Sequence, residues 1–179
     1  MLAGSSMDLR FFHNLGATVL SRRPLCGGIK SEAWAGTFGA IAGVQMTDLE
    51  SSDLIVVWGN NVSYSNLHLA PVLQRLRDRG GKVVVVDPKR IKVAEQADLH
   101  LGLRPGTDVV LAFALAAELE RRGAFDQEFI YRMVEGAEAF MAQARQFSIE
   151  RAAEITGLAA NEIKQLATWY QEAEAATVA

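Results

Sequence analysis

Cysteine is almost absent from the sequence, with Cys26 standing alone among 179 residues. One cysteine excludes an internal disulfide framework and a zinc site built from several cysteines. A surplus of positive charge is also missing. The formal net charge is -3, whereas binding to nucleic acid or to an anionic membrane surface would require a basic surplus. We therefore expect a globular chain that has no nucleic-acid partner.

Long apolar runs are missing as well. No run approaches the roughly 18 residues of a membrane span, and the first residues lack the charged start and apolar block of a secretory signal. We expect no direct membrane insertion of this segment. The sequence leaves two compartments open, the cytoplasm and the periplasm, because export of a longer parent protein would depend on sequence outside this segment.

Short apolar runs alternate with helical patterns along the chain. Leu54 to Trp58 and Val83 to Val86 are continuous apolar runs, typical of strands that are buried on both faces of a parallel sheet. The alternating piece Asp98 to Leu103 predicts a third strand. Helical spacing predicts helices over 7–15, 31–43, 67–79, 107–122, 126–134, 137–147, 148–157 and 159–175. The order predicts an α/β fold with a doubly wound, mainly parallel, Rossmann-like sheet.

Three segments are expected along the chain. Residues 1–52 hold N-terminal helices and a loop at 22–28, and residues 53–123 form an α/β dinucleotide-binding core. Residues 124–179 form a helical extension, and their final "ATVA" predicts the start of a further strand. We therefore expect a fragment of a larger multidomain protein.

Polar residues follow the end of the first predicted strand. Gly59 comes directly after Trp58 and allows a ligand to approach the backbone closely. Asn60, Asn61 and Ser63 supply hydrogen-bond donors and acceptors, and they also suit the cap of the next helix. In open parallel sheets, ligands bind beyond the carboxyl ends of the strands, so this segment is a candidate binding site.

The second predicted strand ends in an acid, a proline and two cations. Asp87 suits a ribose hydroxyl or a guanine edge, because a carboxylate accepts two parallel hydrogen bonds. Pro88 shapes the turn, and Lys89 and Arg90 suit contacts with a phosphate or a ring. The alternative for this segment alone is a type I turn with solvated charges.

A third polar segment follows the third predicted strand. In "RPGTD", a Pro-Gly turn at Gly106 precedes Thr107 as a helix cap and Asp108 in the first helical turn. Helix capping alone would explain this segment, as it would the first. Three such segments at one sheet edge favour a nucleotide site, although the G-x-G-x-x-G turn that a plain NAD-binding site needs is absent after the first strand.

These motifs carry a family resemblance. The stretch from Asp53 to Leu119 resembles the molybdopterin-dinucleotide-binding core of the molybdopterin oxidoreductases, which include formate dehydrogenases, nitrate reductases and dimethyl sulfoxide reductase. The resemblance extends from about Leu25 to Tyr170. Family members hold molybdenum or tungsten through pterin dithiolenes, usually of two guanine dinucleotides.

The resemblance implies a role for each polar segment. Trp58 to Asn61, with Ser63, would line one molybdopterin guanine dinucleotide. Asp87 to Arg90 would meet its guanosine end, and Gly106 to Asp108 would close over the same nucleotide.

Cys26 occupies the position at which family members place the protein ligand of the metal, which is Cys, selenocysteine, Ser or Asp. The resemblance therefore implies Cys26 as metal ligand and catalytic residue, since a thiolate is a soft donor. Gly27 and Gly28 would leave room for a bulky cofactor. The alternative is a small buried hydrophobic residue, and some relatives lack a protein ligand here.

The function that the resemblance implies depends on further domains. The chain would be part of a molybdenum- or tungsten-dependent oxidoreductase catalytic subunit that supports two-electron oxidation or reduction of a small substrate. Its expected partners are the remaining domains of the parent chain and an iron–sulfur electron-transfer subunit, with an iron–sulfur cluster only in the missing N-terminal domain.

Two alternatives stay open. One is a cofactor-free electron-relay scaffold like the large peripheral-arm subunit of respiratory complex I, and the other is an ordinary nucleotide-binding domain with Asp87 on a ribose. The presence of all three motifs together with Cys26 favours the oxidoreductase.

Overall fold

The computed structural model describes residues 2–18, 26–39 and 43–179. The chain divides into two compact units, Met1–Gly43 and Val44–Ala179, and each is described by itself. The division into segments 1–52, 53–123 and 124–179 stays a prediction.

The described part of the first unit contains two helices, α1 (Leu2–Asn14) and α2 (Gly27–Phe38). The helix predicted over 7–15 is present as α1, which begins earlier in the chain. The side chains of α2 are all at least partly exposed.

The predicted start of α2 at Ser31 is wrong. The helix begins one turn earlier, and the Ser31 hydroxyl donates to the Gly27 carbonyl at 2.8 Å inside it. Gly27 and Gly28 are therefore helical and do not belong to a loop. The rest of the predicted loop up to Leu25 lies outside the described residues, as does Ile41.

Among the described residues, four parallel strands form one sheet in the spatial order β3-β2-β1-β4. The strands are β1 (Leu54–Trp58), β2 (Lys82–Val86), β3 (Leu99–Leu101) and β4 (Ala176–Val178). The predicted bounds of β1 are confirmed, and the C-terminal "ATVA" does form a strand. The expected parallel α/β fold is confirmed.

Side chains of β1 alternate between two apolar cores, one on each face of the sheet. Leu54 and Val56 belong to the first core, while Ile55 and Val57 belong to the second. All four are at most 1% exposed, because helices cover both faces. This double burial is the reason why the strand is a continuous apolar run in the sequence.

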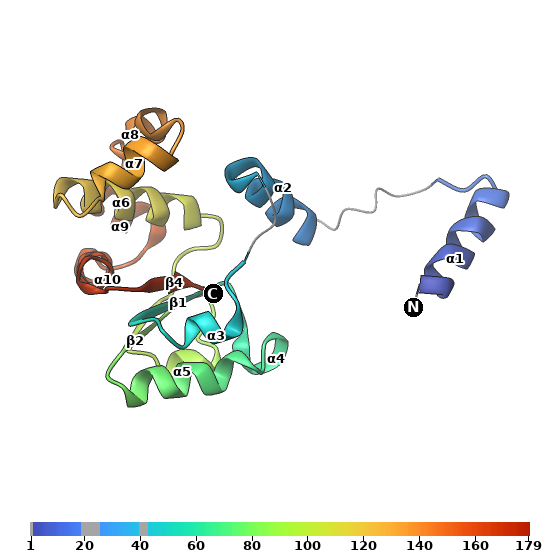
Figure 1. Ribbon diagram of the computed structural model, residues 1–179, viewed down its shortest axis with the longest axis horizontal. Coiled ribbons are helices and arrows are strands. Elements are labelled where there is room, and N and C mark those ends of the chain that lie inside the picture. Colours follow the sequence, from blue (N-terminus) through green and yellow to red (C-terminus); the bar gives the residue numbers. More distant parts are fainter. Residues whose placement is uncertain (1, 19–25, 40–42) are drawn as a thin grey trace. The chain divides into compact units, whose positions relative to one another are not determined.

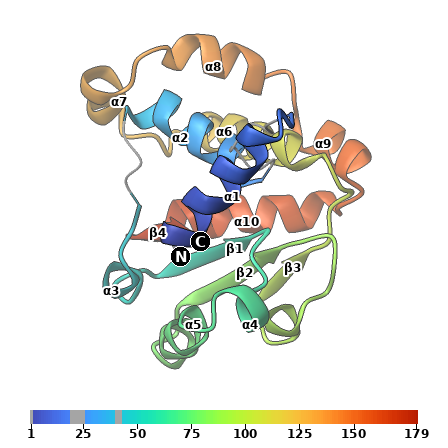
Figure 2. The same ribbon diagram turned by 90° about the vertical axis from the view of Figure 1, so that its right-hand side faces the viewer.

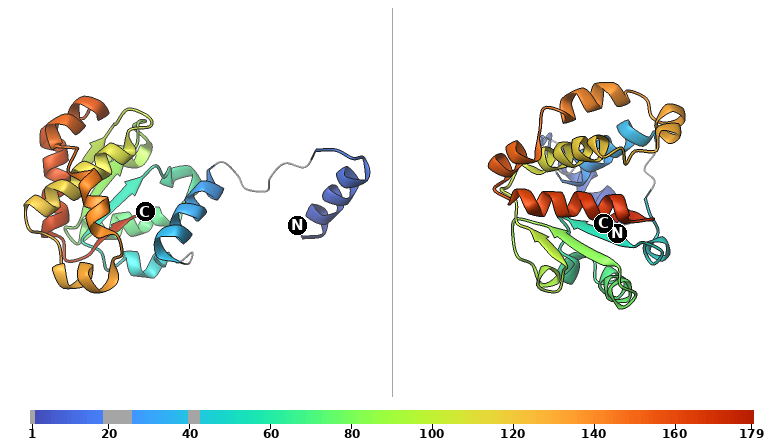
Figure 3. Two further views of the ribbon diagram at one scale, coloured as in Figure 1. Left: turned by 90° about the horizontal axis from the view of Figure 1, so that it is seen from above. Right: turned by 90° about the vertical axis from the view of Figure 1, so that its left-hand side faces the viewer.

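Helices cover the two faces of the sheet, as Figures 1 and 2 show. The face with the second core is covered by α3 (Met46–Leu49), α4 (Val62–Ser65), α5 (Leu69–Asp78) and the 3₁₀ helix η1 (Lys92–Glu95). The face with the first core is covered by α6 (Asp108–Arg121), α9 (Ile149–Thr156) and α10 (Ala160–Glu172). The right-hand view of Figure 3 shows α10, in red, beside α6, in yellow.

Two further helices, α7 (Gln127–Met133) and α8 (Ala137–Ala144), lie between α6 and α9 in the chain. α8 packs on α6, where the Phe140 and Phe113 rings are 5.5 Å apart. Among the described residues, every helix is too short or too polar to cross a membrane.

Several boundaries differ from the predicted ones for local reasons. The third strand, Leu99–Leu101, is shorter than the predicted Asp98 to Leu103. Just before it, the Asp98 amide donates to the Val83 carbonyl and the Asp98 carboxylate accepts from the Val83 amide, both at 2.9 Å. The last helix is shorter than the predicted 159–175 and ends at Glu172. That helix begins at Ala160, and the Glu162 carboxylate accepts a bond from the Ala159 amide at 2.9 Å. The short helices α3, α4 and η1 were not predicted.

Candidate functional site

The three polar segments emerge at one edge of the sheet, because the ends of their strands are in register. Trp58 of β1 pairs with Val86 of β2, and Val86 pairs with Leu101 of β3. The Gly59 amide donates to the Val86 carbonyl at 2.9 Å, and the Asp87 amide donates to the Leu101 carbonyl at 3.2 Å. The segments therefore begin side by side at the carboxyl ends of the strands.

The first segment turns sharply away from β1. Gly59 has a φ of +61°, which favours glycine, and a Cβ atom there would have no neighbour within 4 Å. Asn60 and Ser63 are half-buried beside it. The segment thus leaves open space directly over the backbone.

Asn61 carries an unsatisfied polar atom. Its Oδ1 is buried and has no hydrogen-bond partner among the described residues. Asn61 stands at the N-cap position of α4, but its side chain makes no capping bond, so the predicted cap is wrong. A buried acceptor of this kind is uncommon and is stabilised by a donor from a ligand or water.

The second segment presents an acid on an ordered turn. Asp87 is half-buried, and its Oδ1 accepts from the Lys89 amide at 2.8 Å. The His100 Nε2 atom lies 2.9 Å from the Asp87 carbonyl, so His100 also fixes this turn. Sequence reasoning missed His100, which lies on β3. Its only signal was its place one residue before the end of that strand.

Cations lie free beside this acid. Pro88, Lys89 and Arg90 are exposed. The Lys89 and Arg90 side chains form no ion pair with any described residue. Uncompensated cations at the edge of a sheet suit an anionic ligand.

The third segment is linked directly to the first. The Trp58 indole Nε1 donates to the Asp108 Oδ1 at 2.8 Å, which joins the end of β1 to the first turn of α6. Thr107 is half-buried and stands at the N-cap position of α6, with Asp108 in the first helical turn, as predicted. Its side chain makes no capping bond, and its hydroxyl donates to the Arg104 carbonyl at 2.7 Å. Gly106, next to it, is exposed.

Arg104 ties this segment to the helical layer, which sequence reasoning did not detect. Its Nη1 donates to the carbonyls of Glu154 at 2.7 Å and Ile155 at 3.1 Å, both in the last turn of α9. Its backbone amide donates to the Thr156 carbonyl at 2.8 Å. The arginine thus caps α9 with both its side chain and its backbone.

Cys26 belongs to the other compact unit. It is a free, exposed cysteine directly before α2, and its carbonyl accepts from the Lys30 amide at 3.2 Å. The alternative of a buried small hydrophobic residue is therefore wrong. No cluster of three or more His, Cys, Asp or Glu within the described ranges could hold a metal ion.

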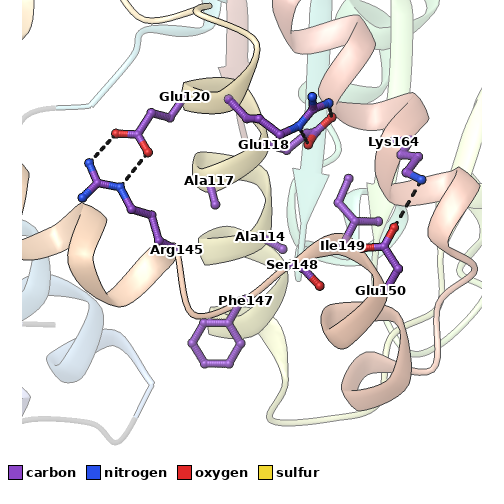
Figure 4. Close-up of a pocket in the computed structure, with 11 residues that line it drawn as sticks. Ala114, Ala117, Glu118, Glu120, Arg145, Phe147, Ser148, Ile149, Glu150 and Lys164 are labelled. Atoms are coloured by element: carbon purple, nitrogen blue, oxygen red, sulfur yellow. Dashed lines mark hydrogen bonds and ion pairs between the residues drawn. The ribbon is translucent and has the colours of Figure 1, made fainter.

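A separate hollow of about 520 Å³ lies beside α6, close to the starts of α9 and α10. Figure 4 shows Glu120 paired with Arg145 and Glu150 paired with Lys164 on its walls. The closest N–O distances are 2.7 Å and 3.3 Å. The predicted site residues do not line it, so this hollow is distinct from the strand-end site.

Glu118 is the buried acid of this hollow, with 8% of its side chain exposed. It accepts from Arg121 at 2.7 and 2.8 Å and from Arg122 at 2.8 Å. The hydrogen bonds from Arg121, and to a smaller extent the one from Arg122, lower the pKa of Glu118 to about 2, although burial acts in the opposite direction. Arg122 also donates to the Thr168 hydroxyl at 2.9 Å, so the cluster joins α6 to α10.

Comparison with known proteins gives concordant matches. The family model for molybdopterin oxidoreductase matches residues 6–174. The probable oxidoreductase YoaE of Bacillus subtilis (strain 168) is 30% identical over 171 residues, which are 96% of this chain and 25% of the relative. Formate dehydrogenase H of Escherichia coli (strain K12) is 29% identical over 133 residues, which are 74% of this chain and 19% of the relative.

A solved structure has the same fold. Acetylene hydratase from Pelobacter acetylenicus superposes with a TM-score of 0.76 at 30% identity, over 86% of this chain and 21% of that one. The chain therefore spans about a quarter or less of the length of these relatives.

Proposed function

The chain belongs to the molybdopterin oxidoreductase family, and from this premise we propose that it cradles one molybdopterin guanine dinucleotide in a molybdenum- or tungsten-dependent catalytic subunit. The observation that carries the proposal is the alignment of three polar segments at one sheet edge, where Asn61 Oδ1 is buried and has no hydrogen-bond partner in the described part of the chain.

The residues at this edge fit such a group chemically. Gly59 leaves open space over the backbone, and Asn61 offers an acceptor for a donor of the ligand. Asp87 has the acceptor chemistry that a guanine edge requires. Lys89 and Arg90, which form no ion pair with the residues that the structure describes, suit the phosphates.

The third segment would close the site. In this proposal Trp58, Asn60 and Ser63 line the dinucleotide from the side of β1. Gly106, Thr107 and Asp108 face it from the start of α6, and the bond between Trp58 and Asp108 fixes the two walls to each other.

Cys26 is proposed as the metal ligand and catalytic residue. Its exposure and its free thiol support this role, because a thiolate is a soft donor for such metals. The bound cofactor supplies the two-electron chemistry, and the protein positions it. Since no metal-binding cluster occurs among the described residues, Cys26 would act as a single protein ligand.

The reaction class has two candidates. Oxidation or reduction of a small substrate is supported by the names of the oxidoreductase and formate dehydrogenase relatives. Hydration without net electron transfer is supported by the two acetylene hydratase matches at 30% identity. For the redox candidate we propose an iron–sulfur partner, in keeping with relatives whose names include "subunit alpha".

The test uses the full-length parent, purified anaerobically from a host that makes the cofactor. We expect about one molybdenum or tungsten ion per chain by plasma mass spectrometry, and roughly two GMP after mild acid hydrolysis. Absence of both would reject the proposal in favour of a cofactor-free scaffold like the complex I subunit. NAD or another nucleotide in place of GMP would favour the ordinary nucleotide-binding domain.

Variants separate the two kinds of site. Asp87→Asn is expected to lower the GMP content, and Asp78→Asn, which changes an exposed acid at the end of α5, is its matched control. Cys26→Ala is expected to alter the metal content and the metal spectrum while leaving GMP in place. Dependence of turnover on an electron acceptor then distinguishes redox chemistry from hydration.

A further inference from the structure

The segment with Gly106, Thr107 and Asp108 has few bonds of its own to the sheet. Among the described residues, Trp58 donates to Asp108, and Thr107 donates to the Arg104 carbonyl, at 2.7 Å from its hydroxyl and at 3.2 Å from its amide. The Thr107 carbonyl also accepts from the Val110 and Leu111 amides, at 3.0 and 3.3 Å, so α6 holds one end of the segment and Arg104 holds the other.

Arg104 in turn is held by the end of α9. The last carbonyls of a helix lack partners inside the helix and carry partial negative charge, which a guanidinium satisfies well. Arg104 donates hydrogen bonds to three successive carbonyls. Its Nη1 donates to Glu154 and Ile155 at 2.7 and 3.1 Å, and its backbone amide donates to Thr156 at 2.8 Å. The segment is thus anchored on a helix that is far from it in the sequence.

The residue after α9 is shaped for this contact. Gly157 has a φ of +79° and ends the helix in the left-handed conformation. A Cβ atom at this position would lie 3.2 Å from Arg104 Nε and 3.4 Å from its Cζ, closer than ordinary contact. Glycine therefore leaves the room that the guanidinium occupies.

We propose that Arg104 is a positioning residue for the dinucleotide site. It holds Gly106, Thr107 and Asp108 in place against α9, and so controls how long the dinucleotide stays bound, although its Nη1 is occupied by main-chain carbonyls. This inference rests on the proposed function, and it gives Arg104 a role in retaining the dinucleotide that is exerted through the segment with Gly106, Thr107 and Asp108.

The first experiment measures retention of the cofactor in the full-length parent. We expect Arg104→Ala to release GMP-containing cofactor on dilution roughly tenfold faster than the wild type, the scale of one charge-assisted hydrogen bond. Arg104→Lys should recover part of the retention, because an ammonium can still donate to a carbonyl. Arg122→Ala is the control: it removes an arginine that joins α6 to α10, and we expect a lower Tm with unchanged release.

A second pair of variants leaves Arg104 itself intact. Gly157→Ala and Gly123→Ala both place alanine at a positive φ, +79° and +66°, but only the first brings a Cβ against Arg104. We expect faster release in Gly157→Ala and wild-type release in Gly123→Ala.

Hydrogen exchange of the amides of Arg104, Gly106, Thr107 and Asp108 in the cofactor-free parent provides a readout that does not depend on cofactor loading. Faster exchange in Arg104→Ala than in Arg122→Ala supports the anchoring. Equal exchange and equal release in these two variants would overturn it. Absence of GMP from the wild type would reject the proposed function, and with it the effect on retention, and the exchange measurement would then decide the anchoring alone.

Discussion

Glu118 offers a direct test of how charge stabilises this fold. The substitution Glu118→Gln keeps the size of the side chain but removes the charge that holds Arg121 and Arg122. The Glu118 side chain is 8% exposed and that of Arg122 is 18% exposed, so solvent screens the bond between these two weakly, whereas the bond to Arg121, which is 70% exposed, is screened more. We expect a marked loss in the free energy of unfolding at neutral pH.

The magnitude follows from the pKa. A lowering of the Glu118 pKa from its ordinary value of 4.5 to about 2 corresponds to about 3 kcal/mol, at roughly 1.4 kcal/mol per pKa unit. The folded state holds the charged form more tightly than the unfolded state does. This contribution is therefore fully present above pH 4.5 and is lost as the pH falls through about 2.

The assay is urea unfolding followed by circular dichroism, for the wild type and for Glu118→Gln, at several pH values. At pH 7 we expect Glu118→Gln to be less stable by about 2 to 3 kcal/mol. The difference should shrink steadily between pH 4.5 and pH 2. Glu128→Gln is the matched control, since Glu128 also pairs with an arginine but its side chain is 79% exposed.

Two results would refute this reasoning. One is a Glu118→Gln variant that loses no more stability than Glu128→Gln, for which we expect less than about 0.5 kcal/mol. The other is a difference at pH 7 that persists unchanged near pH 2, because the charge would then have no part in it.

Three further predictions concern packing, capping and the link across the site. Val84→Ala, at a fully buried position of β2, should cost about 2 to 3 kcal/mol, whereas Val109→Ala, at a position that is 55% exposed, should cost less than about 0.5 kcal/mol in urea unfolding. Asp126→Ala should cost about 1 kcal/mol in the same assay, because the Asp126 carboxylate accepts from the Phe129 amide at the start of α7. Asp108→Ala should free the Trp58 indole and cost about 1 kcal/mol, while Asp108→Asn keeps an acceptor and should cost less, as followed by unfolding and by tryptophan fluorescence.

The strands could be predicted because a strand that is buried on both faces has apolar side chains at consecutive positions. Leu54 to Trp58 is apolar at every position, and the structure gives β1 these same bounds. The parallel order and the meeting of the strand ends follow from general rules for such sheets. The sequence was therefore sufficient to predict that the segments starting at Gly59 and Asp87 lie side by side at one edge of the sheet.

Helix capping by side chains, and hydrogen bonds between residues far apart in the chain, could not be predicted from the sequence. Asn61 and Thr107 are good capping residues by type, yet neither side chain caps its helix, because the path of the preceding loop decides where each side chain points. The bond from Trp58 to Asp108 and those from Arg104 to α9 join residues about 50 positions apart. Such pairs depend on the packing of whole elements, and no local pattern encodes them.

The spatial order of the sheet has a consequence for its local opening. β1 is hydrogen-bonded to β2 on one side and to β4 on the other, whereas β4 pairs only with β1 among the described strands. β2 likewise lies between β1 and β3, so amide protons of β1 and β2 should be the slowest to exchange with deuterated water. Those of Ala176–Val178 should exchange much sooner, because they need only a local fraying event. Trp58 ends β1 and Asp87 follows the end of β2, so two segments of the candidate site begin on the two best protected strands of the sheet.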